Sequence, residues 1–174
     1  KIVYIIPNIP DKSLPVGGPE NNKIVKSWGK NPNVSFNPKN HIELAEKLKV
    51  SLWLEPLNDK IDHPGYFLTS SDEGAALCRE VGSKRLKLLF DCYHMQVMEG
   101  DLCGHIRRNL DVIGHFHSAG HPGRHELWLG ETNYPVLLSE ITKAGYRGVF
   151  AFEYMPTLPP AQSLRRTLDY LKEV

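Results

Sequence analysis

The sequence predicts an α/β fold built on parallel β-strands, and three observations lead to that prediction. Short apolar runs alternate with longer segments of helical periodicity, which is typical of βαβ units. Four of these runs are followed by an acid or a histidine at intervals of 26 to 36 residues, close to the ~30 residues of one crossover unit. The 174 residues, 41% hydrophobic and 24% charged, suit one globular domain. A closed barrel and an open, doubly wound sheet are both compatible with this alternation.

The first expected strand is Ile2 to Ile6, because the run Ile-Val-Tyr-Ile-Ile is apolar throughout and ends at Pro7. The next segment, Pro7 to Pro38, is rich in Pro, Gly, Asn and Lys and has few periodic apolar positions, so we expect a long loop. The sequence starts at Lys1, without Met and directly against an apolar strand. We therefore expect that a preceding part of the fold is missing from this chain.

Regular elements are expected from Asn40 onward. Ile42, Ala45 and Leu48 recur at helical spacing after Asn40, a suitable N-cap, which predicts a helix over His41 to Lys49. Similar signals predict a helix from Ser70 or Ser71 to Gly82, and helices over Asp101–Leu110, Tyr134–Ala144 and Pro160–Lys172. The strands expected between the helices are Val50–Leu54, Leu86–Phe90, Val112–Phe116 and Val149–Phe152.

Charge and cysteine content point to a small-molecule partner and a cytoplasmic setting. The 21 Lys and Arg residues nearly balance the 20 Asp and Glu residues, so the basic excess of a nucleic-acid-binding surface is missing. No apolar run approaches the ~18 residues of a membrane span. The three cysteines, Cys78, Cys92 and Cys103, form no CxxC pair, which favours a reducing compartment over a disulfide framework.

Four potential metal ligands stand at the ends of four consecutive expected strands, namely Glu55, Asp91, His117 and Glu153. A single acid at such a position often does no more than cap a helix. In parallel α/β folds, however, catalytic groups gather at the carboxyl ends of the strands. Three carboxylates brought together there would repel one another unless a cation neutralised them. The mixed oxygen and nitrogen ligands suit Mn²⁺, Mg²⁺, Co²⁺ or Zn²⁺. The lack of thiolate ligands argues against a structural zinc site.

Several longer motifs resemble the hydroxypyruvate isomerase family. The two longest are Phe90 to Leu102, FDCYHMQVMEGDL, and Gly114 to Gly120, GHFHSAG. Shorter matching motifs are PGRHE from Pro122, GETNY from Gly130, EPLN from Glu55, and FEY from Phe152 with Pro156 after it. The resemblance extends from about Leu44 to Leu171. It implies a xylose isomerase-like TIM barrel and isomerisation of a small keto acid or sugar through an enediolate.

The resemblance also implies roles for six residues. Glu55, Asp91, His117 and Glu153 fall on the family's divalent-metal ligands, and Glu55 and Glu153 fall on its paired acid/base carboxylates as well. His94 and Arg124 fall on residues that bind substrate oxygens. The family barrel has eight strands, and its ligands lie on the last four. With five strands expected here, we predict a single domain over residues 1–174 that lacks the first part of the barrel. Such barrels often pair, which is compatible with a homo-oligomer.

The sequence leaves both the reaction and the roles of two further residues open. Hydroxypyruvate isomerases often have Gln where this chain has His117, whereas ketose 3-epimerases have His, so a 3-epimerase is the main alternative. Asp91 and His94 are also compatible with the metal pattern of AP endonucleases on the same fold. That activity needs more His ligands and a basic surface, which the net charge of +1 argues against. Around the site, Asn58 either orients Glu55 or is an ordinary turn asparagine, and Glu126 is either a partner of the site or a solvated loop residue.

Overall fold

The computed structural model describes residues 21, 26, 29–30 and 34–172. Contacts divide the chain into two units, residues 1–39 and 40–174, and the second unit contains the helices and strands described below. The expected strand Ile2–Ile6 lies outside the described residues, as does most of the expected loop Pro7–Pro38.

The second unit is built on a parallel sheet, as predicted. The described part has four strands, β1 (Leu52–Leu54), β2 (Leu86–Asp91), β3 (Ile113–Ser118) and β4 (Phe150–Phe152), in the order β1-β2-β3-β4. Every neighbouring pair is parallel. All four carboxyl ends therefore lie at one edge of the sheet, where side chains from distant parts of the sequence can meet.

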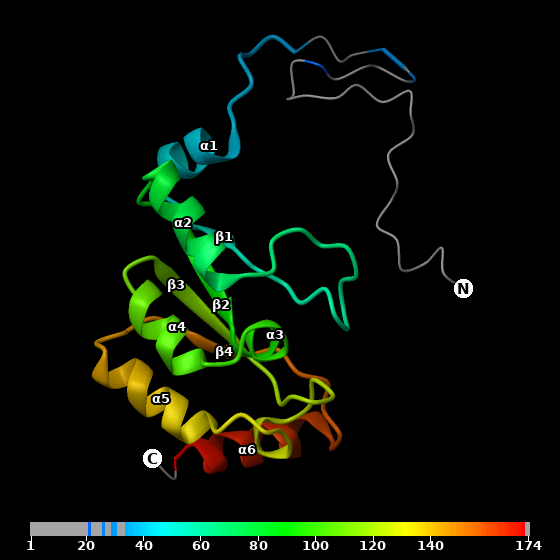
Figure 1. Cartoon of the computed structure of the whole chain (residues 1–174). Helices are drawn as coiled ribbons and strands as arrows, with labels where there is room; N and C mark the ends of the chain where they lie inside the picture. Colours follow the sequence, from blue (N-terminus) through cyan, green and yellow to red (C-terminus); the bar gives the residue numbers. More distant parts are fainter. Residues whose placement is uncertain (1–20, 22–25, 27–28, 31–33, 173–174) are drawn as a thin grey trace. The chain divides into compact units, whose positions relative to one another are not determined.

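Five longer helices accompany the strands (Figure 1): α1 (His41–Leu48), α2 (Ser71–Val81), α4 (Leu102–Asn109), α5 (Tyr134–Lys143) and α6 (Pro160–Leu171). Their ends follow the capping signals of the sequence. Asn40 and Glu43 form the predicted capping box at the start of α1, and Ser70 caps α2. Gly82 ends α2 with φ 65°, a left-handed conformation that glycine adopts without strain.

The two faces of the sheet have different roles. Leu88, Phe90 and Phe116 are fully buried and belong to one hydrophobic core with residues of α2, α4 and α5. Because side chains alternate along a strand, the residues between them face the other way. The β2–β3 pairing has a register irregularity at Leu88/Leu89, and beyond it Phe90 pairs with Phe116 and Asp91 pairs with His117. The core thus fixes two strands whose other face carries candidate site residues.

The structure differs from the predicted elements in three places. β1 starts at Leu52 rather than Val50, because the Val50 N–H still donates to Ala45 in the last turn of α1. β2 and β3 extend to Asp91 and Ser118, so two candidate ligands lie within strands rather than after them. Two short helices were not predicted, α3 (Cys92–Met98) and the 3₁₀ turn η3 (Leu127–Leu129).

Two further features of the described residues concern membrane spans and cysteines. None of the helices in the described part of the chain combines the length and apolar character needed to cross a membrane. All three cysteines carry free thiols, as predicted, and Cys92 is fully buried in the core.

Candidate active site at the strand ends

The three predicted carboxylates come together at the carboxyl ends of the strands. One ligand atom each from Glu55, Asp91, His94 and Glu153 lies within 4.8 Å of the others. Glu55 directly follows β1, Asp91 ends β2, and Glu153 directly follows β4. We call these four residues together with His117 the strand-end cluster. The sequence placed four of them at strand ends, whereas His94 comes from the unpredicted helix α3.

His117 lies between two of the carboxylates. Its Nδ1 atom is 3.4 Å from Glu153 Oε2 and 3.7 Å from Glu55 Oε1. Two buried atoms of this group, His117 Nδ1 and Glu55 Oε1, have no hydrogen-bond partner among the described residues. Buried polar atoms are nearly always paired, and an unpaired group is often explained by an ion or a water at the site. The pair is therefore suited to hold a cation.

Burial and mutual repulsion favour the protonated forms of two cluster acids. The pKa of Glu55 is raised to about 7, first by burial and then by the negative charges of Asp91 and Glu153, while Arg124 acts in the opposite direction. Burial also raises the pKa of Asp91 to about 7, although backbone N–H groups of Tyr93 and His94 favour its ionised form. Without a cation, the cluster therefore holds protons near neutral pH.

Asp91 is fixed by the helix that follows it. Its Oδ1 atom accepts hydrogen bonds from the backbone N–H groups of Tyr93 at 2.7 Å and His94 at 3.3 Å, so that it caps α3. The carboxylate is 1% exposed, and its Oδ2 atom faces His94 Nε2 at 3.7 Å. One side chain thus ends β2, starts α3 and presents an oxygen to the cluster.

Arg124 approaches the cluster from a tight loop. Gly120 and His125 form an antiparallel bridge, and Arg124 between them has a left-handed backbone with φ 56°. Its Nη2 atom donates to Glu153 Oε2 at 2.7 Å, and its guanidinium lies 5.1 Å from the centre of the Tyr93 ring. Arg124, to which the resemblance assigned a substrate-binding role, is the only Lys or Arg side chain paired with Glu153 among the described residues.

His94 is held from behind by Asn58, and both residues are fully buried. The backbone N–H and the side-chain amide of Asn58 lie 3.2 Å and 2.7 Å from His94 Nδ1. The prediction that Asn58 orients Glu55 is wrong, because its other side-chain bonds go to Ile61 and Asp62. Sequence spacing pointed to the acid three residues away, whereas the actual partner is 36 residues away on the next βα unit.

Glu126 is a buried carboxylate that connects the loop of Arg124 to residues after β4. It is 0% exposed and accepts hydrogen bonds from Thr157 N–H at 2.8 Å, Thr157 hydroxyl at 2.9 Å, Leu158 N–H at 3.3 Å and Ser163 hydroxyl at 2.9 Å. Although burial acts to raise its pKa, these bonds lower the pKa of Glu126 to about 2. Of the two possibilities left open by the sequence, the solvated loop residue is excluded.

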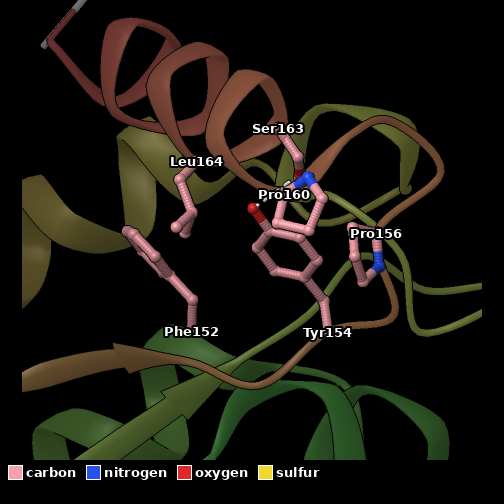
Figure 2. A pocket seen from close by; sticks show the side chains of 6 residues that line it. All are labelled: Phe152, Tyr154, Pro156, Pro160, Ser163 and Leu164. Carbon is pink, nitrogen blue, oxygen red and sulfur yellow. Dashed lines mark hydrogen bonds between the residues drawn. The ribbon is translucent and has the colours of Figure 1, made fainter.

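Two cavities adjoin β4, and they differ in chemistry. A cavity of about 470 Å³ beside the cluster is lined by Arg124 and by Phe152 to Met155, including Glu153. The other, of about 170 Å³, lies between β4 and α6 and is largely apolar (Figure 2). Within it the Tyr154 hydroxyl lies 2.8 Å from Ser163 Oγ, and Phe152 and Leu164 line the opposite side. The first cavity is the one next to the charged side chains.

Comparison with known proteins gives a consistent result. Residues 33–174 match the protein family described as Xylose isomerase-like TIM barrel. A 2-oxo-tetronate isomerase from Cupriavidus necator is 43% identical over 122 residues, which cover 70% of this chain and 46% of that protein. The hydroxypyruvate isomerase of Escherichia coli is 35% identical over 155 residues, covering 83% of this chain and 60% of that protein. Among solved structures, an AP endonuclease of family 2 from Brucella melitensis has a TM-score of 0.70 at 32% identity, covering 74% of this chain and 50% of that chain.

Proposed function

The chain belongs to the xylose isomerase-like TIM barrel family, and we propose that it is a divalent-metal-dependent isomerase of a small keto acid or sugar, with hydroxypyruvate as the first candidate. The observation that carries this proposal is the convergence of three carboxylates and two histidines at the strand ends. The two isomerases to which the chain is similar support the substrate class. The chain spans 46% and 60% of their lengths, so the activity of the whole protein is a proposal.

We propose that Glu55, Asp91, His117 and Glu153 hold the metal, which is Mn²⁺, Mg²⁺, Co²⁺ or Zn²⁺. The donor set is three oxygens and one nitrogen, which suits these hard or borderline ions. The unpaired buried atoms Glu55 Oε1 and His117 Nδ1 support this choice, as do the raised pKa values of Glu55 and Asp91. When bound, such an ion would stabilise negative charge that develops on the substrate oxygens.

Glu55 and Glu153 are the proposed acid/base pair. Isomerising a 2-keto-3-hydroxy compound moves one proton from the hydroxyl-bearing carbon to the carbonyl carbon through an enediolate. The hydroxyl proton is transferred to the former carbonyl oxygen, so that carbonyl and hydroxyl exchange places. Of the two acids, Glu55 has its pKa raised to about 7, which suits a group that accepts and returns a proton near neutral pH. Glu153 is held by Arg124 and is more exposed, at 48% of its side chain.

His94 and Arg124 are the proposed substrate-binding residues. Both reach the cluster, because His94 Nε2 is 3.7 Å from Asp91 Oδ2 and Arg124 contacts Glu153 directly. Arg124 presents a planar set of donors that matches a carboxylate. A keto acid would give it such a partner, in place of its present ion pair with Glu153.

A substrate panel tests the proposal. The protein is loaded with Mn²⁺, Mg²⁺, Co²⁺ or Zn²⁺ and incubated with hydroxypyruvate, a 2-oxo-tetronate, tagatose and fructose. We expect conversion of hydroxypyruvate to tartronate semialdehyde, or of the 2-oxo-tetronate to its isomer, which stops on chelation. Turnover that is unaffected by metal removal would contradict the proposal.

The same panel separates the second candidate, a ketose 3-epimerase. His117 favours this reading, since the resemblance places His at this ligand in the epimerases. Conversion of tagatose or fructose without action on the keto acids would establish it instead. Abasic DNA belongs in the panel as well, because one structural neighbour is described as an AP endonuclease. The net charge of +1 leads us to expect no cleavage. Cytoplasmic location and self-association remain predictions.

A further inference from the structure

The two ring nitrogens of His94 have different surroundings. Nδ1 is 2.7 Å from the Asn58 side-chain amide and 3.2 Å from the Asn58 backbone nitrogen. Nε2 faces the cluster, 3.7 Å from Asp91 Oδ2 and 3.4 Å from Arg124 Nη2. A neutral imidazole carries one proton, so one nitrogen donates and the other accepts.

The orientation of the Asn58 amide follows from its other hydrogen bonds. Its oxygen accepts from two backbone N–H groups, Ile61 at 3.1 Å and Asp62 at 2.9 Å. Because backbone nitrogens can only donate, the atom that they contact must be the oxygen. The remaining amide atom is therefore the nitrogen, and it has two hydrogens to donate. Asp62 Oδ2 at 2.6 Å takes one of them, which leaves the other for His94 Nδ1.

His94 Nδ1 consequently faces two N–H groups of Asn58 and must be the acceptor. The proton of the neutral ring then sits on Nε2. Arg124 Nη2 also lies near Nε2, but at 3.4 Å this single contact is longer than either contact of Nδ1, so the two Asn58 donors decide the tautomer. A second proton on Nδ1 would face these two donors and find no acceptor there.

We propose that Asn58 is a positioning residue that fixes His94 as the neutral tautomer with its proton on Nε2. His94 is then a hydrogen-bond donor toward the cavity, not a metal ligand, although its distance from the three carboxylates would allow ligation. That this N–H donates a hydrogen bond to a substrate oxygen rests on the proposed isomerase function. The assignment of the tautomer does not depend on that function.

Asp62 connects Asn58 to Arg124, the other proposed substrate-binding residue. Its Oδ2 atom accepts from Asn58 and also from the Tyr93 hydroxyl at 2.9 Å. The Tyr93 ring lies beneath the Arg124 guanidinium. One carboxylate therefore supports both the amide that orients His94 and the ring on which Arg124 lies. With Asn58 and His94 fully buried, an unpaired donor or acceptor here would lose its hydration without compensation, so the arrangement is kept only while each group is paired.

Nitrogen NMR of the metal-free protein, labelled with ¹⁵N in the histidine rings, tests the tautomer directly. A His94→Gln variant identifies the His94 signals by their disappearance. We expect the wild-type spectrum at pH 7 to show Nε2 protonated and Nδ1 unprotonated. The reverse assignment, or a mixture of the two tautomers, would overturn the proposal. Addition of Zn²⁺ should leave the Nε2 proton of His94 in place while it shifts a His117 nitrogen.

Variants of nearly equal shape test the role of Asn58. Asn58→Asp replaces the donor by an acceptor, so we expect the His94 proton to move to Nδ1 and kcat/KM to fall by about 10–100-fold. The matched control is Asp59→Asn, an exchange of the same two residue types at the next position, where the side chain makes no hydrogen bond recorded in the described residues. Unchanged His94 signals in Asn58→Asp would refute the role of Asn58. If that variant does not fold, the wild-type spectrum still decides the tautomer, and an inactive wild type with the expected tautomer would refute only the isomerase.

Discussion

The two sides of the candidate site are built in different ways. On the β2 side, Asn58, Asp91 and His94 are at most 1% exposed and are tied by hydrogen bonds to backbone and side chains. On the β4 side, the Glu153 and Arg124 side chains are 48% and 21% exposed and are held mainly by one ion pair. Buried, fully bonded groups keep their geometry, whereas exposed ion pairs contribute little and exchange partners readily. The buried side is thus prearranged, and the open side is free to rearrange around a substrate.

Substitution of the paired acids Glu55 and Glu153 should have the largest effect on activity. It tests whether both sides of the site take part in the chemistry. We expect Glu55→Gln and Glu153→Gln each to lower kcat by about 10²–10⁴-fold, because each removes one proton-transfer group. The control is Glu80→Gln on the exposed surface of α2. Turnover at the wild-type level in both variants, with metal bound, would show that the acid/base assignment is wrong.

The two histidines sharpen the comparison, since we assign them to different tasks. His117→Ala should weaken metal binding by more than the about 10–100-fold typical for loss of a ligand's hydrogen-bond partner. His94→Gln should keep metal affinity and lose substrate affinity. Calorimetric titration, started from the metal-free proteins, measures metal affinity and then substrate affinity. The control is His41→Gln at an exposed histidine. The opposite result, with metal affinity lost in His94→Gln alone, would exchange the two roles.

A variant of Glu126 tests whether its buried hydrogen bonds stabilise the β4 side of the site. Glu126→Ala leaves Thr157 and Ser163 without their acceptor, so we expect the free energy of unfolding to fall by about 1–3 kcal/mol. Urea unfolding measures this, and Glu131→Ala, at a more exposed carboxylate of the same loop, is the control. Equal stability of both variants would show that the hydrogen bonds of Glu126 do not stabilise the fold. Metal affinity should change little, because Glu126 lies outside the strand-end cluster.

The pH dependence of stability should be the smallest effect and should belong to the cluster acids. The folded-state pKa values of Glu55 and Asp91, both about 7, lie above their ordinary values of 4.5 and 3.8. The protons stabilise the folded state below pH 4, and this contribution is lost as the pH rises through the folded-state pKa values of about 7. Urea unfolding between pH 5 and 8 should therefore show the metal-free protein losing at least about 1 kcal/mol, the equivalent of roughly one pKa unit. Saturating Mg²⁺ should remove the loss, and Glu55→Gln should reduce it.

Local signals in the sequence were enough to predict much of the fold. The capping residues Asn40 and Ser70, the terminal Gly82 and the apolar runs gave the main helices and strands close to their observed bounds. The same strand ends predicted that Glu55, Asp91 and Glu153 would meet, because parallel strands align their carboxyl ends. These features depend on neighbours within a few residues or on a regular repeat.

The missed features depend on contacts between distant residues. Helix α3 has seven residues, too few to show a clear periodicity, and its cap is Asp91, which the sequence suggested as a metal ligand. Asn58 finds His94 at a separation of 36 residues, and Glu126 finds Ser163 at 37. A loop acid and a turn asparagine carry no local signal for such partners. Only the folded arrangement of neighbouring βα units brings them together.

The central claim is that the side chains at the strand ends share one cation. Anomalous diffraction from crystals grown with Mn²⁺ tests it most directly. We predict one peak bonded to oxygens of Glu55, Asp91 and Glu153 and to His117 Nδ1, with His94 Nε2 outside the bonding distance of about 2.0–2.3 Å. A peak bonded to His94 with His117 apart would contradict the ligand assignment. Carboxylates that bind no ion at saturating Mn²⁺ would contradict the whole account.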